Sequence, residues 1–240
     1  MTTVELEKVT KARRGEDKRR YDDACAAAHG MDLIGERWSM PLIRELLFGP
    51  RRFSDLRASL NGISANVLTQ RLEGLEAAGV LTRRKLPPPA SVQVYELTRW
   101  GYEAAPIFAA LGRWAVRSPQ HDPTRPFSPV SLMLSLRTML DAAAAQGFEA
   151  SIVFHIGNEA YHWSKAGEEV KVGRGAPDKP DLVMAAPDAS TVAAAIYGGA
   201  PVETVLVEGN VALARRFPSL FILPEKASAS GVVEAPSQLP

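Results

Sequence analysis

The sequence predicts two domains: a mainly helical domain that carries a β-hairpin, followed by an α+β domain with an antiparallel sheet and helices on one face. Three observations support this organisation. At 240 residues the chain is long enough for two cores of ordinary size. Helical periodicity prevails to about residue 118, and alternating strands follow a Pro-rich stretch. The formal charge divides at the same place, because the first 118 residues carry +5 and the remainder −4 of the net +1.

Composition predicts where each part begins and ends. Residues 1–20 are charge-dense without apolar periodicity, which predicts a basic N-terminal arm. The helical domain is expected over 21–118, and the stretch 119–129, which reads PQHDPTRPFSP, is typical of a linker. The α+β domain is expected over 130–226, with a flexible tail at 227–240.

Apolar spacing predicts a succession of helices in the first domain. Apolar side chains recur at three- and four-residue steps from Leu33 to Leu46, which indicates a helical segment that stops at Gly49–Pro50. Pro41 lies inside this segment and is expected to kink or divide it. A shorter helix follows and ends at Asn61–Gly62.

The next helix is expected to have a buried face and a polar face. Ser64 suits the N-cap position, and Gly79 ends the helix. The inner face is apolar, and the polar side chains point away from the core. The inner positions are Val67, Leu68, Leu72 and Leu75; the outer positions are Asn66, Thr69, Gln70 and Glu73.

A β-hairpin and a further helix complete the domain. The segments VLTRRKL and VQVYELT alternate as strands do, PPPAS lies between them, and a helix is expected over about 99–116. Helices followed by a hairpin in this order predict a winged helix-turn-helix. This fold inserts the second helix of its motif into the major groove of DNA, and basic residues of the hairpin suit the phosphate backbone.

The candidate DNA contacts are polar residues of the expected reader helix and basic residues near the hairpin and the second helix. Arg71 has two open interpretations, contact with DNA or an ion pair with Glu73 or Glu76. Arg51 and Arg52 either contact phosphates or lie in a solvated turn. The complete set is Ser64, Asn66, Thr69, Gln70, Arg71, Arg83, Arg84, Lys85, Arg51 and Arg52.

Several short motifs follow one another along residues 25–116. They are Cys25, GERW at 35–38, RRFSDL at 51–56, LTQRLEGLE at 68–76, GVLTRR at 79–84 and VYELT at 94–98. This segment resembles the HxlR-type transcriptional regulators, within the wider group of winged-helix regulators that includes the MarR proteins. The resemblance implies a homodimeric repressor or activator that binds double-stranded DNA, with residues 64–77 as its reader helix. Ala26 stands where the family usually has proline.

The second half is similar to a different family. The hairpins GNEAYHWSKAGEEVKV, the strand PDLVMAAPD, the helix that ends at YGGAP and the segment VEGNVALARRF resemble the sterol carrier protein type 2 family. This resemblance implies an apolar cavity between sheet and helices that binds a hydrophobic molecule. A purely structural role for the domain also stays open. The candidate pocket residues are Phe154, His155, Trp163 and Tyr197.

Cysteine and histidine usage limits the chemistry. Cys25 is the only cysteine, so no intramolecular disulfide forms, and a reducing cytoplasmic setting is expected. Cys25 is either a redox sensor, as in some HxlR-type relatives, or a buried inert thiol. The four histidines lack metal-ligand spacing, and no nucleophile elbow or phosphate-binding loop is present. We therefore expect no catalytic residue, metal or cofactor, and no apolar run long enough to cross a membrane.

Together these patterns predict a dimeric, sequence-specific transcriptional regulator that is not an enzyme and is tuned by a hydrophobic effector in its second domain. The alternative is a lipid-binding or carrier protein whose winged helix serves protein contacts.

Overall fold

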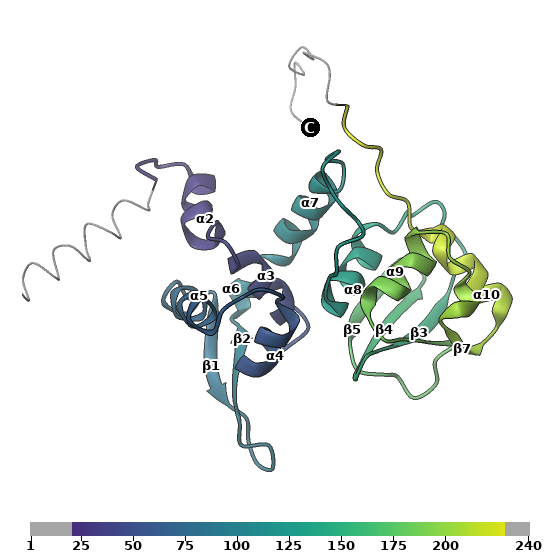
Figure 1. The fold of residues 1–240 in the computed structure, drawn as a ribbon, viewed down its shortest axis with the longest axis horizontal. Coiled ribbons are helices and arrows are strands. Elements are labelled where there is room, and N and C mark those ends of the chain that lie inside the picture. Colours follow the sequence, from purple (N-terminus) through teal and green to yellow (C-terminus); the bar gives the residue numbers. More distant parts are fainter. Residues whose placement is uncertain (1–20, 229–240) are drawn as a thin grey trace, which may run out of the picture. The chain divides into compact units, whose positions relative to one another are not determined.

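The computed structural model describes residues 21–228, which divide into two compact units between Ala104 and Ala105 (Figure 1). The expected arm at 1–20 and most of the expected tail at 227–240 lie outside the described residues. The division precedes helix α7 (Ala105–Ala115), whereas composition places a linker at 119–129.

The first unit packs helices around a leucine-rich core beside a two-stranded hairpin. Leu42 and Leu46, Leu56, and Leu68 and Leu72 come from three successive helices, and each is at most 1% exposed. The elements are α2 (Ala26–Ile34), α3 (Ser39–Leu46), α4 (Phe53–Ser59), α5 (Ala65–Ala77), β1 (Leu81–Lys85), β2 (Gln93–Leu97) and α6 (Arg99–Tyr102).

The helical segment around Pro41 is divided, but ahead of the proline. Trp38 has a left-handed φ of 80° and precedes α3, so α2 and α3 are separate helices. Pro41 is the third residue of α3, in its first turn, where a backbone N–H has no partner inside the helix. Proline therefore interrupts nothing at this position.

The hairpin is extended by a short third segment. Strands β1 and β2 are antiparallel, with Leu81 opposite Leu97 and Lys85 opposite Gln93. The backbone of Arg51 exchanges hydrogen bonds of 2.9 and 2.8 Å with that of Tyr95 in β2. This bridge fixes the start of α4 to the hairpin.

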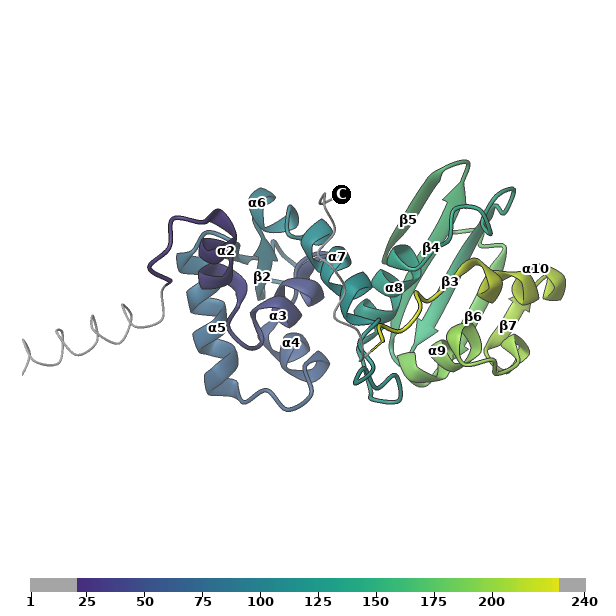
Figure 2. The ribbon, with the colours of Figure 1, turned by 90° about the horizontal axis from the view of Figure 1, so that it is seen from above.

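The second unit contains a five-stranded mixed sheet in the order β5-β4-β3-β6-β7, with helices α8, α9 and α10 gathered along one side of it (Figure 2). Strands β3 and β6 are parallel, so the expectation of an antiparallel sheet is wrong for this pair. Residues 175–181 lead from the end of β5 back to the end of the sheet at which β3 begins, so β6 runs in the direction of β3. The elements are α8 (Pro129–Thr138), β3 (Ala150–Ile156), β4 (Glu159–Ala166), β5 (Glu169–Arg174), β6 (Leu182–Ala186), α9 (Ala189–Tyr197), η1 (Val202–Thr204), β7 (Leu206–Gly209), α10 (Val211–Arg216) and η2 (Phe217–Leu220).

Aromatic side chains fill the core of this unit. Phe217 packs edge-to-face on Trp163, with ring centroids 5.0 Å apart, and on Phe221 at 4.9 Å. The ring centroids of Phe148 and Phe154 lie 6.0 and 6.1 Å from that of Phe217. Phe217 therefore links the helical segment after α10 to the sheet.

We expect Phe217→Ala to destabilise the second unit by roughly 3–5 kcal/mol, because the truncation leaves a cavity at the centre of the aromatic cluster. Urea unfolding followed by circular dichroism measures this change. His155→Ala provides the control: its side chain is exposed on β3, so its effect is expected to stay within about 0.5 kcal/mol. Equal effects of the two substitutions would contradict the packing described.

Candidate nucleic-acid interface

Three leucines fix the orientation of α5. Leu68, Leu72 and Leu75 are 0%, 1% and 2% exposed, and they occupy one side of the helix. The N-terminus is capped as expected, because Ser64 Oγ accepts a hydrogen bond of 3.3 Å from the Val67 backbone N–H. Gly62, with φ of 87°, provides the left-handed turn between α4 and α5.

The polar residues of the first two turns of α5 lie together on the outside. Asn66, Thr69 and Gln70 are all exposed. Their side chains have no hydrogen bond within residues 21–228, so their donors and acceptors are available to a partner. An exposed row of short polar side chains at the start of a helix is the arrangement that reads base edges in a major groove.

Arg71 is held by neither of the two acidic residues expected from sequence. Its guanidinium pairs with Glu36 at 3.0 Å, and Glu36 lies in the turn between α2 and α3. This ion pair ties the middle of α5 to a segment more than thirty residues away in sequence. Arg71 therefore has an internal partner, and contact with DNA would require it to exchange that partner.

The arginines of the wing are also paired. Arg83 Nε lies 2.8 Å from Glu76 of α5, and Arg84 Nε pairs with Glu96 on the neighbouring strand. The hydrogen bonds that Arg83 donates to Glu76 and Arg84 donates to Glu96 raise the pKa of both guanidinium groups, so both remain cationic. The positive field of β1 is thus partly offset by acidic neighbours.

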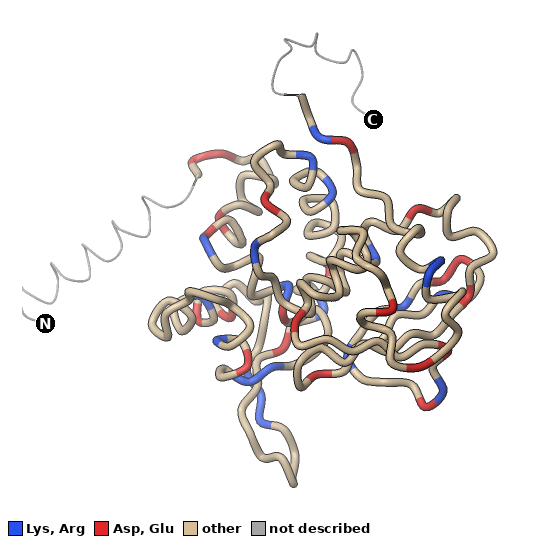
Figure 3. The backbone as a smooth tube through the Cα atoms, turned by 45° about the vertical axis from the view of Figure 1, so that its right-hand side comes forward, with Lys and Arg blue, Asp and Glu red and all other residues tan. Residues whose placement is uncertain are grey.

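Lys85 completes the basic run, and the tip of the hairpin carries no charge. Lys85 is exposed and makes no ion pair with any residue in the described part of the chain. The tip, residues 86–92, reads LPPPASV and is drawn in tan between the charged strands in Figure 3. The positive charge of the wing therefore sits on its strands, close to α5.

The two arginines ahead of α4 differ in their surroundings. Arg51 is only 8% exposed, and its guanidinium donates to Ser59 Oγ at 3.0 Å. A side chain buried to this extent presents little surface to a phosphate, so we assign Arg51 to holding α4 against the wing. Arg52 is exposed, and its backbone N–H donates to Asp55 at 3.4 Å. Of the two, only Arg52 has an accessible guanidinium.

Cys25 lies directly before α2, and its thiol is exposed. The buried interpretation of this residue is therefore wrong. The backbone N–H groups of Ala28 and Ala27, at the start of the helix, lower the pKa of the Cys25 thiol.

The candidate pocket residues of the second unit do not line one cavity. Phe154 and Trp163 are 0% exposed inside the aromatic cluster, whereas His155 is exposed on the opposite face of β3. Tyr197 lies at the end of α9, where its hydroxyl is 3.0 Å from Ser135 Oγ and burial raises its pKa to about 12.

Acidic residues that the sequence analysis did not assign to these arginines complete the site. Glu36, Glu76 and Glu96 are the partners of the arginines, and no local spacing signals these pairs because they join separate elements. A pocket between α7 and α8, lined by alanines and two arginines, was likewise not indicated by any motif. Within residues 21–228 no cluster of side chains suits a metal ion, and no helix is long and apolar enough to cross a membrane.

Comparison with known proteins agrees with this geometry. The model of the HxlR-like helix-turn-helix family matches residues 33–122. The HTH-type transcriptional regulator YvaP of Bacillus subtilis (strain 168) is 36% identical over 85 residues, which cover 35% of this chain and 79% of YvaP. The chain belongs to the HxlR-like helix-turn-helix family.

Other relatives of this HxlR-like chain include YodB of the same organism, an HTH-type transcriptional regulator that is 32% identical over 83 residues, 35% of this chain and 74% of YodB. The solved structure of the reduced form of YodB is 28% identical and covers 42% of this chain and 100% of YodB, with a TM-score of 0.38. The family is one of DNA-binding transcriptional regulators. The family match ends at residue 122, so the sheet of the second unit lies beyond it.

We expect Glu96→Gln to raise the affinity for random duplex DNA by up to about fivefold, because it releases Arg84 from a surface ion pair. Fluorescence anisotropy at several salt concentrations measures this affinity. The matched control is Glu208→Gln, which removes an exposed carboxylate from β7 in the other unit. If the control raised the affinity equally, net charge alone would explain the effect.

Proposed function

We propose that this HxlR-like chain is a homodimeric, sequence-specific regulator of transcription that reads the major groove with α5. The observation that supports it is the exposed row of Asn66, Thr69 and Gln70, opposite the leucines that fix the helix. Asparagine and glutamine suit bidentate contact with adenine, and threonine suits several base edges. Ser64, at the N-terminus of the same helix, suits a phosphate.

The basic residues would bind the backbone of the DNA. Arg52 and Lys85 are exposed, and Arg83 and Arg84 exchange weak internal pairs for phosphates. Arg71 would contact either a base or a phosphate. Once released from Glu36, its guanidinium would be available to DNA at the middle of the reader helix. Such contacts add affinity with little sequence information.

The dimer is supported by an apolar stripe on α7. Ile107, Leu111 and Trp114 follow each other at helical spacing and are 54%, 46% and 73% exposed. Large apolar side chains in a row on one helix are typical of an interface. A dimer would present two copies of α5 to half-sites about 34–36 Å apart. A single-chain mass by light scattering would overturn this part of the proposal.

The second unit would sense a hydrophobic effector in the cytoplasm. Its helices on one side of a sheet are consistent with a sterol-carrier-like domain. Rings around Phe217 fill the space between sheet and helices, so a ligand there would have to displace them. An effector changes DNA affinity only if it binds the two states of the protein with different affinity.

Gln70→Ala and Asn66→Ala are expected to weaken binding to the DNA upstream of the chain's own gene by about 1–3 kcal/mol, or roughly five- to 150-fold, and to change binding to random duplex little. Arg84→Ala is expected to weaken both and to flatten the salt dependence, because it removes a phosphate contact. Anisotropy titrations with both duplexes measure these effects. Equal losses on both duplexes for all three variants would contradict the roles assigned to α5 and the wing.

We also propose that Cys25 acts as a redox-sensing thiol, since it is exposed and its pKa is lowered by the amides of α2. A lowered pKa leaves more thiolate at neutral pH, and the thiolate is the reactive form. The reaction with iodoacetamide should therefore reach half its maximal rate at a lower pH in the folded protein than in the unfolded protein. Mass spectrometry over a pH series measures this rate. The protein unfolded in urea, where the helix is absent, is the reference, and an unchanged midpoint would exclude activation by α2.

A further inference from the structure

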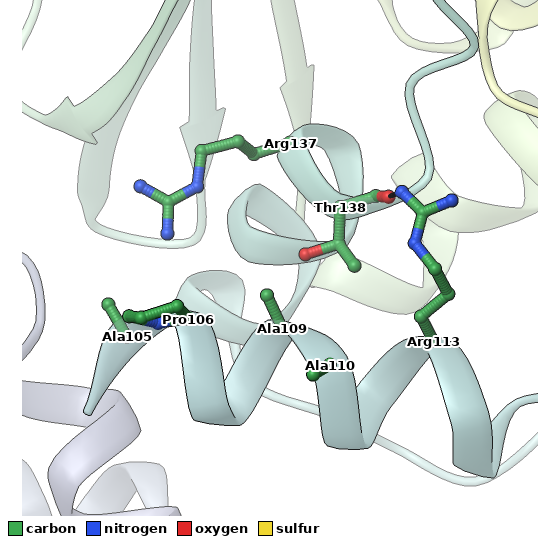
Figure 4. Close-up of a pocket in the computed structure, with 7 residues that line it drawn as sticks. All are labelled: Ala105, Pro106, Ala109, Ala110, Arg113, Arg137 and Thr138. Atoms are coloured by element: carbon green, nitrogen blue, oxygen red, sulfur yellow. Dashed lines mark hydrogen bonds between the residues drawn. The ribbon is translucent and has the colours of Figure 1, made fainter. Parts of the chain in front are cut away.

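A pocket of about 470 Å³ lies between α7 and α8 within the second unit (Figure 4). This volume is within the range of sites that bind small molecules. One wall is the face of α7 on which small side chains recur, and the other is the C-terminal end of α8. The lining residues are Ala105, Pro106, Ala109, Ala110, Arg113, Arg137 and Thr138.

The pocket has positive charge and no acidic residue in its lining. Arg113 donates one hydrogen bond to the backbone carbonyl of Thr138, which leaves its other N–H donors available. The guanidinium of Arg137 has no hydrogen bond or ion pair with any residue from 21 to 228. The hydroxyl of Thr138 likewise has no partner in that range. The pocket therefore offers donors and lacks an anion.

The figure shows how these groups are distributed. Arg137 extends over Ala105 and Pro106, whereas Arg113 lies at the other end beside Thr138 (Figure 4). The side chain of Ala109 points into the space between the two arginines, and Ala110 also lines the pocket. An occupant would thus meet a cation at one end, methyl groups along its body, and a hydroxyl with a second cation at the other end.

We propose that this pocket binds an organic carboxylate with an apolar body, whose carboxylate is held by Arg137. A planar guanidinium binds a carboxylate through two parallel N–H···O bonds, which is the strong form of this contact. The methyl groups of α7 contact the apolar body, and Thr138 and Arg113 accommodate a polar substituent at the far end.

This site differs from the two surfaces already described. The stripe of Ile107, Leu111 and Trp114 lies on a different side of α7. With 3.6 residues per turn, these three positions share one side of the helix, and the pocket-lining positions of α7 share another. The aromatic cluster around Phe217 is apolar, whereas this pocket selects an anion. Binding here does not require binding to DNA, although a regulatory effect of the ligand rests on the proposed function.

The test is isothermal titration calorimetry of the full-length protein with sodium 2-naphthoate, and with 2-naphthamide as the neutral molecule of the same shape. We expect saturable binding of one naphthoate per chain and at least about tenfold weaker binding of the amide, because charge-assisted hydrogen bonds are lost. Absence of saturable naphthoate binding, or equal binding of the amide, would overturn the proposal.

Two variants test the pocket by different means. Arg137→Gln removes the charge, and Ala109→Leu fills the space between the arginines while keeping α7 helical. Each is expected to weaken naphthoate binding by at least about tenfold. Arg125→Gln and Ala115→Leu are the matched controls, since they make the same changes at positions that do not line the pocket. Retained binding in both pocket variants, with circular dichroism like that of the unsubstituted protein, would overturn the assignment.

Repeating the DNA titrations with and without naphthoate separates this inference from the proposed function. Naphthoate binding without any DNA binding would leave the pocket assigned and remove the regulatory role. DNA binding without naphthoate binding would overturn the pocket assignment and leave the proposed regulatory role in place.

Discussion

The burial of three leucines on one side of α5 is the constraint on which the proposed DNA-binding site depends. A helix repeats every 3.6 residues, so placing Leu68, Leu72 and Leu75 in the core also fixes the direction of the polar side chains on the other side. Full burial of a leucine contributes about 1.5–3 kcal/mol, whereas one neutral hydrogen bond contributes about 1. No polar contact can therefore turn the helix against its core.

The charged side chains near this helix are held less firmly than the leucines, because they form ion pairs at the surface and can exchange one partner for another. A surface ion pair contributes only about 0–1 kcal/mol, so replacing Glu76 or Glu96 by a phosphate costs little. The glutamates lower the charge that the free protein presents to any polyanion. In the proposed function, the wing would contact a DNA backbone that α5 has positioned, without holding every duplex tightly.

The repeating patterns of the sequence predicted most of the fold, and the contacts between distant elements were not predictable. The cap at Ser64, the inner leucines and the hairpin follow from local spacing, and the structure contains all three. The break at Trp38, the parallel pairing of β3 with β6 and the pairing of Arg71 with Glu36 depend on how separate elements meet. The burial of Arg51 has the same origin, since its partners lie in α4 and β2. A basic residue in a known motif therefore indicates charge, but its accessibility depends on tertiary packing.

Helix α6 and residues 103–104 form a short covalent connection between the wing of the first unit and α7 of the second. Thr98 Oγ1 donates to the Gly79 carbonyl at 2.8 Å, and Gly101 packs so closely against Val80 that a larger residue would clash. Helix α6 is thereby fixed to the base of the wing, and only residues 103–104 separate it from α7. A ligand between α7 and α8 would hold α7 two residues from that fixed point. Its effect on DNA binding would equal the difference in its affinity for the free and DNA-bound states, so the ligand and the operator would influence each other's binding equally.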